Sequence, residues 1–138
     1  MKTLLVIDGQ GGGFGRALIE RLRCEGLPVR LHAVGTNSLA TSAMLKAGAD
    51  TGATGENAVL VGCRHADLIA GPIGIVMANS MMGEFSPAMA AAVAESTAAR
   101  VLIPVSRCDT YVAGATELNF SQSLDKAVEL LRRLAAAE

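Results

Sequence analysis

The sequence contains few aromatic residues and no block of positive charge. Of its 138 residues only 3% are aromatic, and tryptophan is absent. The core must therefore be built from aliphatic side chains and methionine, which suit the closely packed layers of an α/β protein. Lysine and arginine number 12 against 13 acidic residues, which leaves a net charge of −1. Because a nucleic-acid interface needs a basic surface, this balance argues against a nucleic-acid partner.

Cysteine and long apolar runs are scarce too. The three cysteines, Cys24, Cys63 and Cys108, are too few and too widely spaced for a disulfide framework. Cys63, His65 and Cys108 could supply three metal ligands, but nothing nearby supplies a fourth, so no metal site is predicted. The longest apolar run, 68–78, is about half a membrane span. The first apolar run is too short for a secretion signal, and we expect a cytoplasmic protein without a membrane partner.

The most informative segment is 7–22, which reads IDGQGGGFGRALIERL. An apolar run at 3–7 leads into a cluster of glycines and then into a helical pattern over 13–25. Glycine lets the backbone adopt a positive φ and approach a ligand closely. The start of a helix adds free N–H groups and a partial positive charge. This strand–turn–helix order predicts a loop that binds an anion such as a phosphate.

The glycine-rich segment resembles the first strand–turn–helix unit of short-chain dehydrogenases, whose turn reads Gly-x3-Gly-aliphatic-Gly. By this resemblance, Gly9, Gly13 and Gly15 would line the pyrophosphate of a cofactor. The catalytic Tyr-x3-Lys of that family is missing, because Ala115 stands four residues after Tyr111. The chain is also short for that family. The resemblance therefore implies a cofactor loop but not hydride transfer of that type.

Asp8, at the start of the glycine-rich segment, raises a question about anion binding. A carboxylate next to a bound phosphate costs energy through like-charge repulsion. Its oxygens could accept backbone N–H groups of the loop, could meet Arg16 or Arg107, or could hold Mg²⁺ or a ligand hydroxyl. We favour the first arrangement. A glycine loop that only packs a helix on a strand, with no ligand, is the structural alternative.

Apolar periodicity predicts the remaining elements. The strands are expected at 3–7, 29–34, 58–61, 68–70 and 101–105, with a further one at 110–113. The helices are expected at 13–25, 38–47, 73–80, 88–97 and 121–137, and 73–77 could instead form a strand. This alternation predicts a single Rossmann-like domain over 1–138, a doubly wound α/β fold whose mainly parallel sheet has five or six strands.

Loops that follow parallel strands meet at one edge of the sheet, where ligands bind. The second strand ends in Gly35, Thr36 and Asn37 and carries no acid to hold a ribose, so these neutral donors could meet a ribose or a phosphate, or could simply cap a helix. The polar stretch 52–57 precedes the third predicted strand and is expected at the opposite edge. The predicted site residues are Asp8, Gly9, Gln10, Gly11, Gly12, Gly13, Phe14, Gly15, Gly35, Thr36, Asn37, Gly71, Pro72 and Arg107.

Three further features have weaker signals. Glu84 could act as a general base and Cys108 as a nucleophile, although the sequence shows no partner for either. The segment 79–85 contains two methionines and a phenylalanine, and methionine adapts well to a protein partner. From this segment we expect a homodimer.

Taken end to end, the chain resembles an uncharacterised bacterial family of small proteins known only as a domain of unknown function. The resemblance rests on the segments IDGQGGGFG, GTNSLATSAMLKAGAD, GATGENA, GPIGIVMANSMMGE and LIPVSRCD. It implies a small Rossmann-like protein and assigns no reaction.

From the residues themselves, we expect a protein that binds NAD(P), another nucleotide or another phosphorylated small molecule in a non-catalytic or sensing role. One alternative is a small enzyme that acts on a phosphorylated or nicotinamide-containing substrate through Asp8, Glu84 or Cys108. The other is an oligomeric interaction protein whose glycine loop is purely structural.

Overall fold

The computed structural model describes residues 1–105, 110–115 and 117–137. In these residues five strands form one sheet, and every neighbouring pair is parallel. The strands are β1 (Thr3–Asp8), β2 (Arg30–Gly35), β3 (Thr51–Thr54), β4 (Leu68–Pro72) and β5 (Ala99–Ile103). Their order is β3-β2-β1-β4-β5, which is the order of the first five strands in doubly wound dinucleotide-binding sheets. The predicted α/β fold is confirmed.

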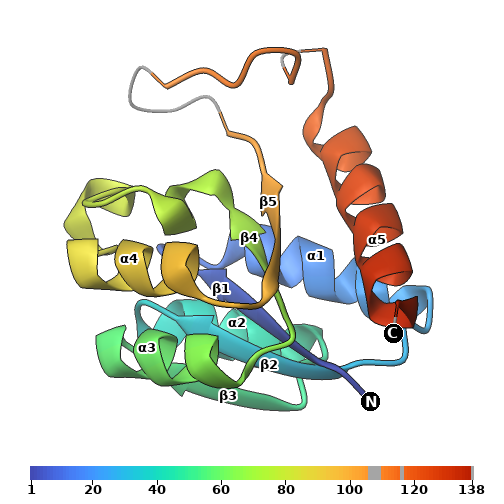
Figure 1. Cartoon of the computed structure of the whole chain (residues 1–138), viewed down its shortest axis with the longest axis horizontal. Coiled ribbons are helices and arrows are strands. Elements are labelled where there is room, and N and C mark those ends of the chain that lie inside the picture. Colours follow the sequence, from blue (N-terminus) through green and yellow to red (C-terminus); the bar gives the residue numbers. More distant parts are fainter. Residues whose placement is uncertain (106–109, 116, 138) are drawn as a thin grey trace.

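Helices cover both faces of the sheet (Figure 1). The longer helices are α1 (Gly13–Cys24), α2 (Ser38–Ala47), α3 (Glu56–His65), α4 (Pro87–Glu95) and α5 (Phe120–Ala136). Side chains of α1, α2 and α5 share one core cluster with the sheet, whereas α3 and α4 share a second cluster on the opposite face. A helix layer on each side explains why the central strands contain almost no polar residues.

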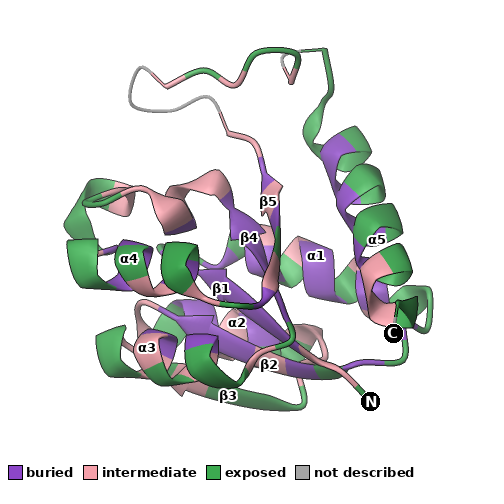
Figure 2. Cartoon of the chain, viewed as in Figure 1, coloured by how far each residue is buried: buried purple, intermediate pink, exposed green. Residues whose placement is uncertain are grey.

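The central strand β1 contributes to both cores. Leu4 and Val6 belong to the cluster under α1 and α5, while Leu5 and Ile7 belong to the cluster under α3 and α4. Successive side chains of a strand point to opposite faces, so a continuous apolar run is buried on both sides. In Figure 2 the sheet is mostly buried and the exposed residues lie on the outer sides of the helices.

Several helix ends follow directly from local sequence. The Asn37 side chain accepts a hydrogen bond from the Ala40 N–H at 2.9 Å and begins α2, and Gly48 ends it. Ser86 accepts a hydrogen bond from the Met89 N–H at 3.2 Å and begins α4. These side-chain caps satisfy N–H groups that the helix itself leaves unpaired. The helix cap that the sequence allowed at Asn37 is confirmed.

The prediction for residues 49–61 was wrong. Residues 58–61 form part of α3 rather than a strand, because Val59 and Cys63, four residues apart, are both buried against the sheet. The third strand is the polar stretch β3, which pairs with β2 at the sheet edge. Gly55 follows β3, and its N–H donates to the carbonyl oxygen of Gly35 at 2.9 Å. This loop therefore lies at the carboxyl edge of the sheet and not at the opposite edge.

Two predictions near β4 and β5 were also wrong. Residues Ile73–Val76 form a single 3₁₀ turn instead of the start of a helix over 73–80 or a strand. The chain does not continue as a helix, because the backbone is extended at Met77 and left-handed at Asn79. Residues 110–113 add no strand to the sheet, which ends at β5. Pro104 directly follows this edge strand, as expected for a residue without an N–H.

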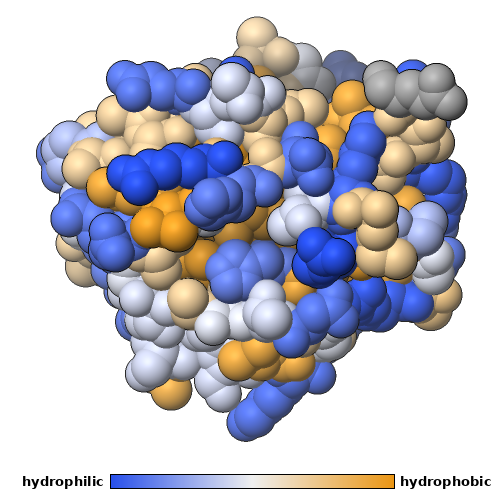
Figure 3. All heavy atoms as spheres, turned by 60° about the horizontal axis from the view of Figure 1, so that its bottom comes forward, coloured by the Kyte–Doolittle hydropathy of each residue, from blue (hydrophilic) through white to orange (hydrophobic). Residues whose placement is uncertain are grey.

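The surface mixes hydrophobic and hydrophilic residues. On the face shown in Figure 3, hydrophobic residues are scattered among hydrophilic ones. The most exposed large hydrophobic residues after the N-terminal methionine, which are Met82, Leu39 and Tyr111, come from three separate segments. Over the described ranges, no helix has both the length and the apolar character needed to cross a bilayer.

Candidate functional site

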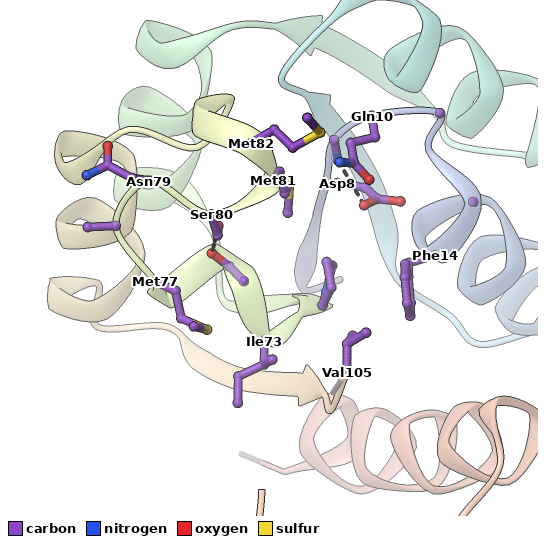
Figure 4. A pocket seen from close by; sticks show the side chains of 16 residues that line it. Asp8, Gln10, Phe14, Ile73, Met77, Asn79, Ser80, Met81, Met82 and Val105 are labelled. Carbon is purple, nitrogen blue, oxygen red and sulfur yellow. Dashed lines mark hydrogen bonds between the residues drawn. The ribbon is translucent and has the colours of Figure 1, made fainter. Parts of the chain in front are cut away.

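A cavity of about 460 Å³ opens at the carboxyl edge of the sheet, between the loops that follow β1 and β4. One wall is the glycine loop, which we define as residues 9–13. The other wall is residues 73–82, and Val105 beyond β5 completes the lining. Figure 4 shows these two walls facing each other across the cavity. Because β1 and β4 are the neighbours at which strand order reverses, the cavity occupies the position where open α/β sheets bind ligands.

Asp8 lies at the base of the cavity and is only 3% exposed. Its two carboxylate oxygens accept the N–H groups of Gly9 at 2.8 Å and Gly15 at 2.7 Å. Burial raises the pKa of Asp8, and these backbone hydrogen bonds oppose the rise. Arg16 pairs instead with Glu20 at 3.0 Å. The first arrangement expected for Asp8 is therefore confirmed: its carboxylate is held within the protein at the start of α1.

Some glycines of this region are required by packing. A Cβ atom on Gly9 would lie 2.5 Å from Sδ of Met81, and one on Gly15 would overlap the side chain of Met44. Gly12 has a φ of 77°, and a Cβ there would lie 2.9 Å from Cα of Ala40. A side chain at Gly12 would overlap the backbone of α2, whereas one at Gly9 or Gly15 would force Met81 or Met44 to shift.

Gly11 and Gly13 are different, because no packing explains them. A Cβ atom on either would meet no atom within 4 Å, and both residues line the cavity. Among hydrogen bonds between described residues, neither N–H has an acceptor. Gly13 is the first residue of α1, where the helix dipole favours a negative group. Both glycines therefore border open space in the cavity, and their backbone N–H groups have no acceptor among the described residues.

Residues with left-handed backbone conformations are concentrated around the cavity. Within the described ranges, the four non-glycine residues with a left-handed φ are Gln10, Asn79, Met81 and Met82. All four line this cavity. Such conformations cost energy for residues with a side chain and are concentrated at functional sites. In the opposite wall, Ser80 Oγ donates to the carbonyl oxygen of Gly74 at 2.6 Å and fixes the turn.

On the far side of the glycine loop, Glu84 joins three segments of the chain. One of its oxygens accepts the Gln10 N–H at 2.7 Å, the Thr36 hydroxyl at 2.6 Å and the Asn37 amide at 3.3 Å. We call this group of four residues the Glu84 clasp. The Thr36 hydroxyl, followed by the other donors, lowers the pKa of Glu84 below its ordinary value. The clasp therefore holds a carboxylate between the ends of β1 and β2.

The structure brings most of the predicted site residues together, but only some of them line the cavity. Those that line it are Asp8, Gly9, Gln10, Gly11, Gly13, Phe14 and Pro72. Those that lie in adjoining loops, in strand ends or in the first turn of α1 without lining it are Gly12, Gly15, Gly35, Thr36, Asn37 and Gly71. Arg107 lies outside the described residues. The lining residues absent from the prediction are Ile73, Gly74, Met77, Ala78, Asn79, Ser80, Met81, Met82 and Val105.

The cavity is mainly apolar and, apart from Asp8, uncharged over the described residues. Phe14, Ile73 and Met77 form much of its apolar surface, and no described lysine or arginine lines it. The side chain of Cys63 lies in the core under α3 and α4, where burial raises its pKa to about 11. Cys108, the other cysteine considered for chemistry, falls outside the described residues.

Comparisons with known proteins identify a family but no activity. A solved structure titled "crystal structure of AibC" is 18% identical, with a TM-score of 0.48, over 99% of this chain and 40% of that one. The chain thus spans less than half of that protein. No curated protein sequence matches the chain. The model of DUF3842, a domain of unknown function, matches residues 3–136. The chain belongs to this family.

Proposed function

We propose that the protein binds a nucleotide or another phosphorylated small molecule in the cavity beside the glycine loop, in a non-catalytic or sensing role. The observation that carries this proposal is the pair Gly11 and Gly13. Packing requires neither glycine, both border the cavity, and the described residues offer their N–H groups no acceptor. Backbone N–H groups at the start of a helix are suited to a phosphate oxygen.

The rest of the cavity suits the body of such a ligand. Its volume of about 460 Å³ falls within the range of roughly 300–1,000 Å³ that is usual for small-molecule sites. Phe14, Ile73 and Met77 offer an apolar surface to a ring. Because Asp8 is engaged by two backbone N–H groups, part of its charge is balanced within the loop.

The two carboxylates near the cavity favour binding over catalysis. Both oxygens of Asp8 accept backbone N–H groups, and Glu84 engages three donors. A general base must be able to reach a proton of the substrate, whereas both oxygens of Asp8 and one oxygen of Glu84 already hold loops together. We therefore assign them structural roles around a binding site.

Thermal unfolding in the presence of candidate ligands tests this proposal. We expect at least one ligand of a panel to raise the melting temperature, since a ligand at a hundred times its Kd adds about 2.7 kcal/mol to stability. The panel contains FMN, AMP, NAD, NADP, ATP and inorganic phosphate. Gly13→Val should abolish the shift by filling the cavity. Ala91→Val, a similar enlargement at an exposed position of α4, should retain it. No shift with any of these ligands would contradict the proposal.

We further propose that segment 79–85 mediates a homodimer. Met82 is 96% exposed, and a fully exposed methionine suits a contact with another protein. Light scattering coupled to size exclusion should give the mass of a dimer for the wild type and of a monomer for Met82→Asp.

The cytoplasmic location stays a prediction of the sequence.

A further inference from the structure

The cavity occupies only one side of the glycine loop. Its lining comes from residues 8–14, residues 72–82 and Val105, which follow β1, β4 and β5. No residue of the loops after β2 or β3 lines it. In doubly wound folds that bind dinucleotides, the ligand lies across the whole crevice, and the end of the second strand holds the ribose of one half. Here the half of the crevice next to β4 is hollow, and the cavity does not extend over the end of β2.

The group that bridges the ends of β1 and β2 is the carboxylate of Glu84, an exposed residue. It engages the hydroxyl of Thr36 and the amide of Asn37, the two polar side chains directly after β2. A Cβ atom on Gly9 would lie 3.0 Å from the nearer Glu84 oxygen, so the carboxylate sits directly over the loop. Asn37 also donates to the carbonyl oxygen of Gln10 at 2.8 Å. The donors that a ribose would need are thus already bonded within the protein.

The clasp also places a negative charge at this end of the crevice. The donors around Glu84 lower its pKa, which favours the ionised carboxylate. A second phosphate that passed between the ends of β1 and β2 would meet this charge in addition to that of Asp8. Like charges at short range oppose binding unless a cation compensates them.

We propose that Glu84 is a specificity-determining residue that closes the β2 side of the site, so that the protein accepts a phosphomonoester carrying one ring system and rejects dinucleotides. This inference rests on the proposed function, because it describes the ligand of the same cavity. The four residues of the clasp are hydrogen-bonded to one another, so their polar groups are not available to a ligand. The ligand can then use only the space beside β4.

Matched ligand pairs test this inference. FMN and FAD, or nicotinamide mononucleotide and NAD, differ by one AMP unit, so their ratio of Kd values reports directly on the second half of the site. We expect the wild type to bind the mononucleotide at least about tenfold more tightly. Glu84→Ala should reduce this ratio at least about fivefold by freeing Thr36 and Asn37. Glu84→Gln, which keeps the size but removes the charge, should give an intermediate ratio.

Two controls make the outcome decisive. Glu95→Ala removes an exposed acid of α4 that does not line the cavity, and it should leave the ratio unchanged. Hydrogen exchange at the Gln10 amide should become faster in Glu84→Ala, which shows that the clasp is open. Equal affinity of the wild type for both members of a pair, or an unchanged ratio with the clasp open, overturns this inference alone. Binding of a dinucleotide without its mononucleotide also overturns this inference alone. Failure of the wild type to bind any ligand of the thermal-unfolding panel overturns the proposed function and this inference with it.

Discussion

The two sides of the glycine loop differ in what covers them. On the β2 side, Gly12 packs against Ala40 of α2, and the Glu84 clasp joins the loop to the end of β2. Gly9 lies between the two sides, because a Cβ atom there would meet Met81 of the cavity wall as well as Thr36 and Glu84. On the β4 side, Gly11 and Gly13 meet open space beside an apolar cavity. A single short loop thus combines glycines that packing requires with glycines that packing does not require. The proposed binding role rests on this contrast more than on the number of glycines.

The largest expected effect comes from adding a methyl group on the closed side. Gly12→Ala should lower the free energy of unfolding by about 3 kcal/mol, because it combines left-handed strain with overlap of the Ala40 backbone. Gly11→Ala should change it by less than about 0.5 kcal/mol. Urea unfolding followed by circular dichroism suits a chain without tryptophan. If the two variants lost similar amounts of unfolding free energy, the two sides of the glycine loop would not differ in packing.

Asp8→Ala should have the next largest effect. The change leaves the N–H groups of Gly9 and Gly15 without their acceptor, and we expect a loss of about 2 kcal/mol in the free energy of unfolding. Asp8→Asn retains one side-chain oxygen as an acceptor and should lose less. If the alanine variant were as stable as the wild type, the carboxylate would not be holding the start of α1.

A smaller loss of stability is expected from breaking the contact between Phe14, which lines the cavity, and Phe120 of α5. The ring of Phe14, which lines the cavity, meets Phe120 edge to face with centroids 4.9 Å apart. Phe120→Ala should cost about 1 kcal/mol. Leu130→Ala, at a position of the same helix with similar exposure, provides the matched control and should cost less. Equal losses would mean that the ring contact contributes nothing specific.

The smallest expected effect is a dependence of the free energy of unfolding on pH, caused by the ionisation of Glu84. Since the folded protein lowers the pKa of Glu84, its ionised form stabilises the fold. That contribution is fully present above the ordinary value of 4.5 and is lost as the pH falls through the lowered folded value. The stability difference between the wild type and Glu84→Gln should therefore be constant near neutral pH and shrink in acid. A difference that grew in acid would have the wrong sign.

Much of the first half of the fold could be predicted from local sequence. The apolar run of β1, the helical period of α1 and the cap at Asn37 all reflect interactions between residues close in the chain. The strand β3 was missed because its sequence, TGAT, is polar and lies at the sheet edge. The apolar run 58–61 predicts a strand but belongs to α3, because Val and Leu in a short run fit either structure.

The site was predictable on one side only. The glycine loop has a local signature, whereas the left-handed conformations of Asn79, Met81 and Met82 carry none, since these residues rarely adopt them. The contact between Thr36 and Glu84 joins residues 48 positions apart. Nothing in the local sequence indicates that Glu84 would contact Thr36 and Asn37. The clasp could therefore be identified only from the tertiary structure.

The most direct test of the account is a ¹⁵N-resolved NMR titration of the protein with FMN, with inorganic phosphate added in a parallel series. If the open side of the glycine loop binds the phosphate, the amide signals of Gly11 and Gly13 should move to lower field as the ligand is added. The Gly9 and Gly15 amides, already bonded to Asp8, should move less. Saturable binding that leaves the Gly11 and Gly13 amides unchanged would contradict the account.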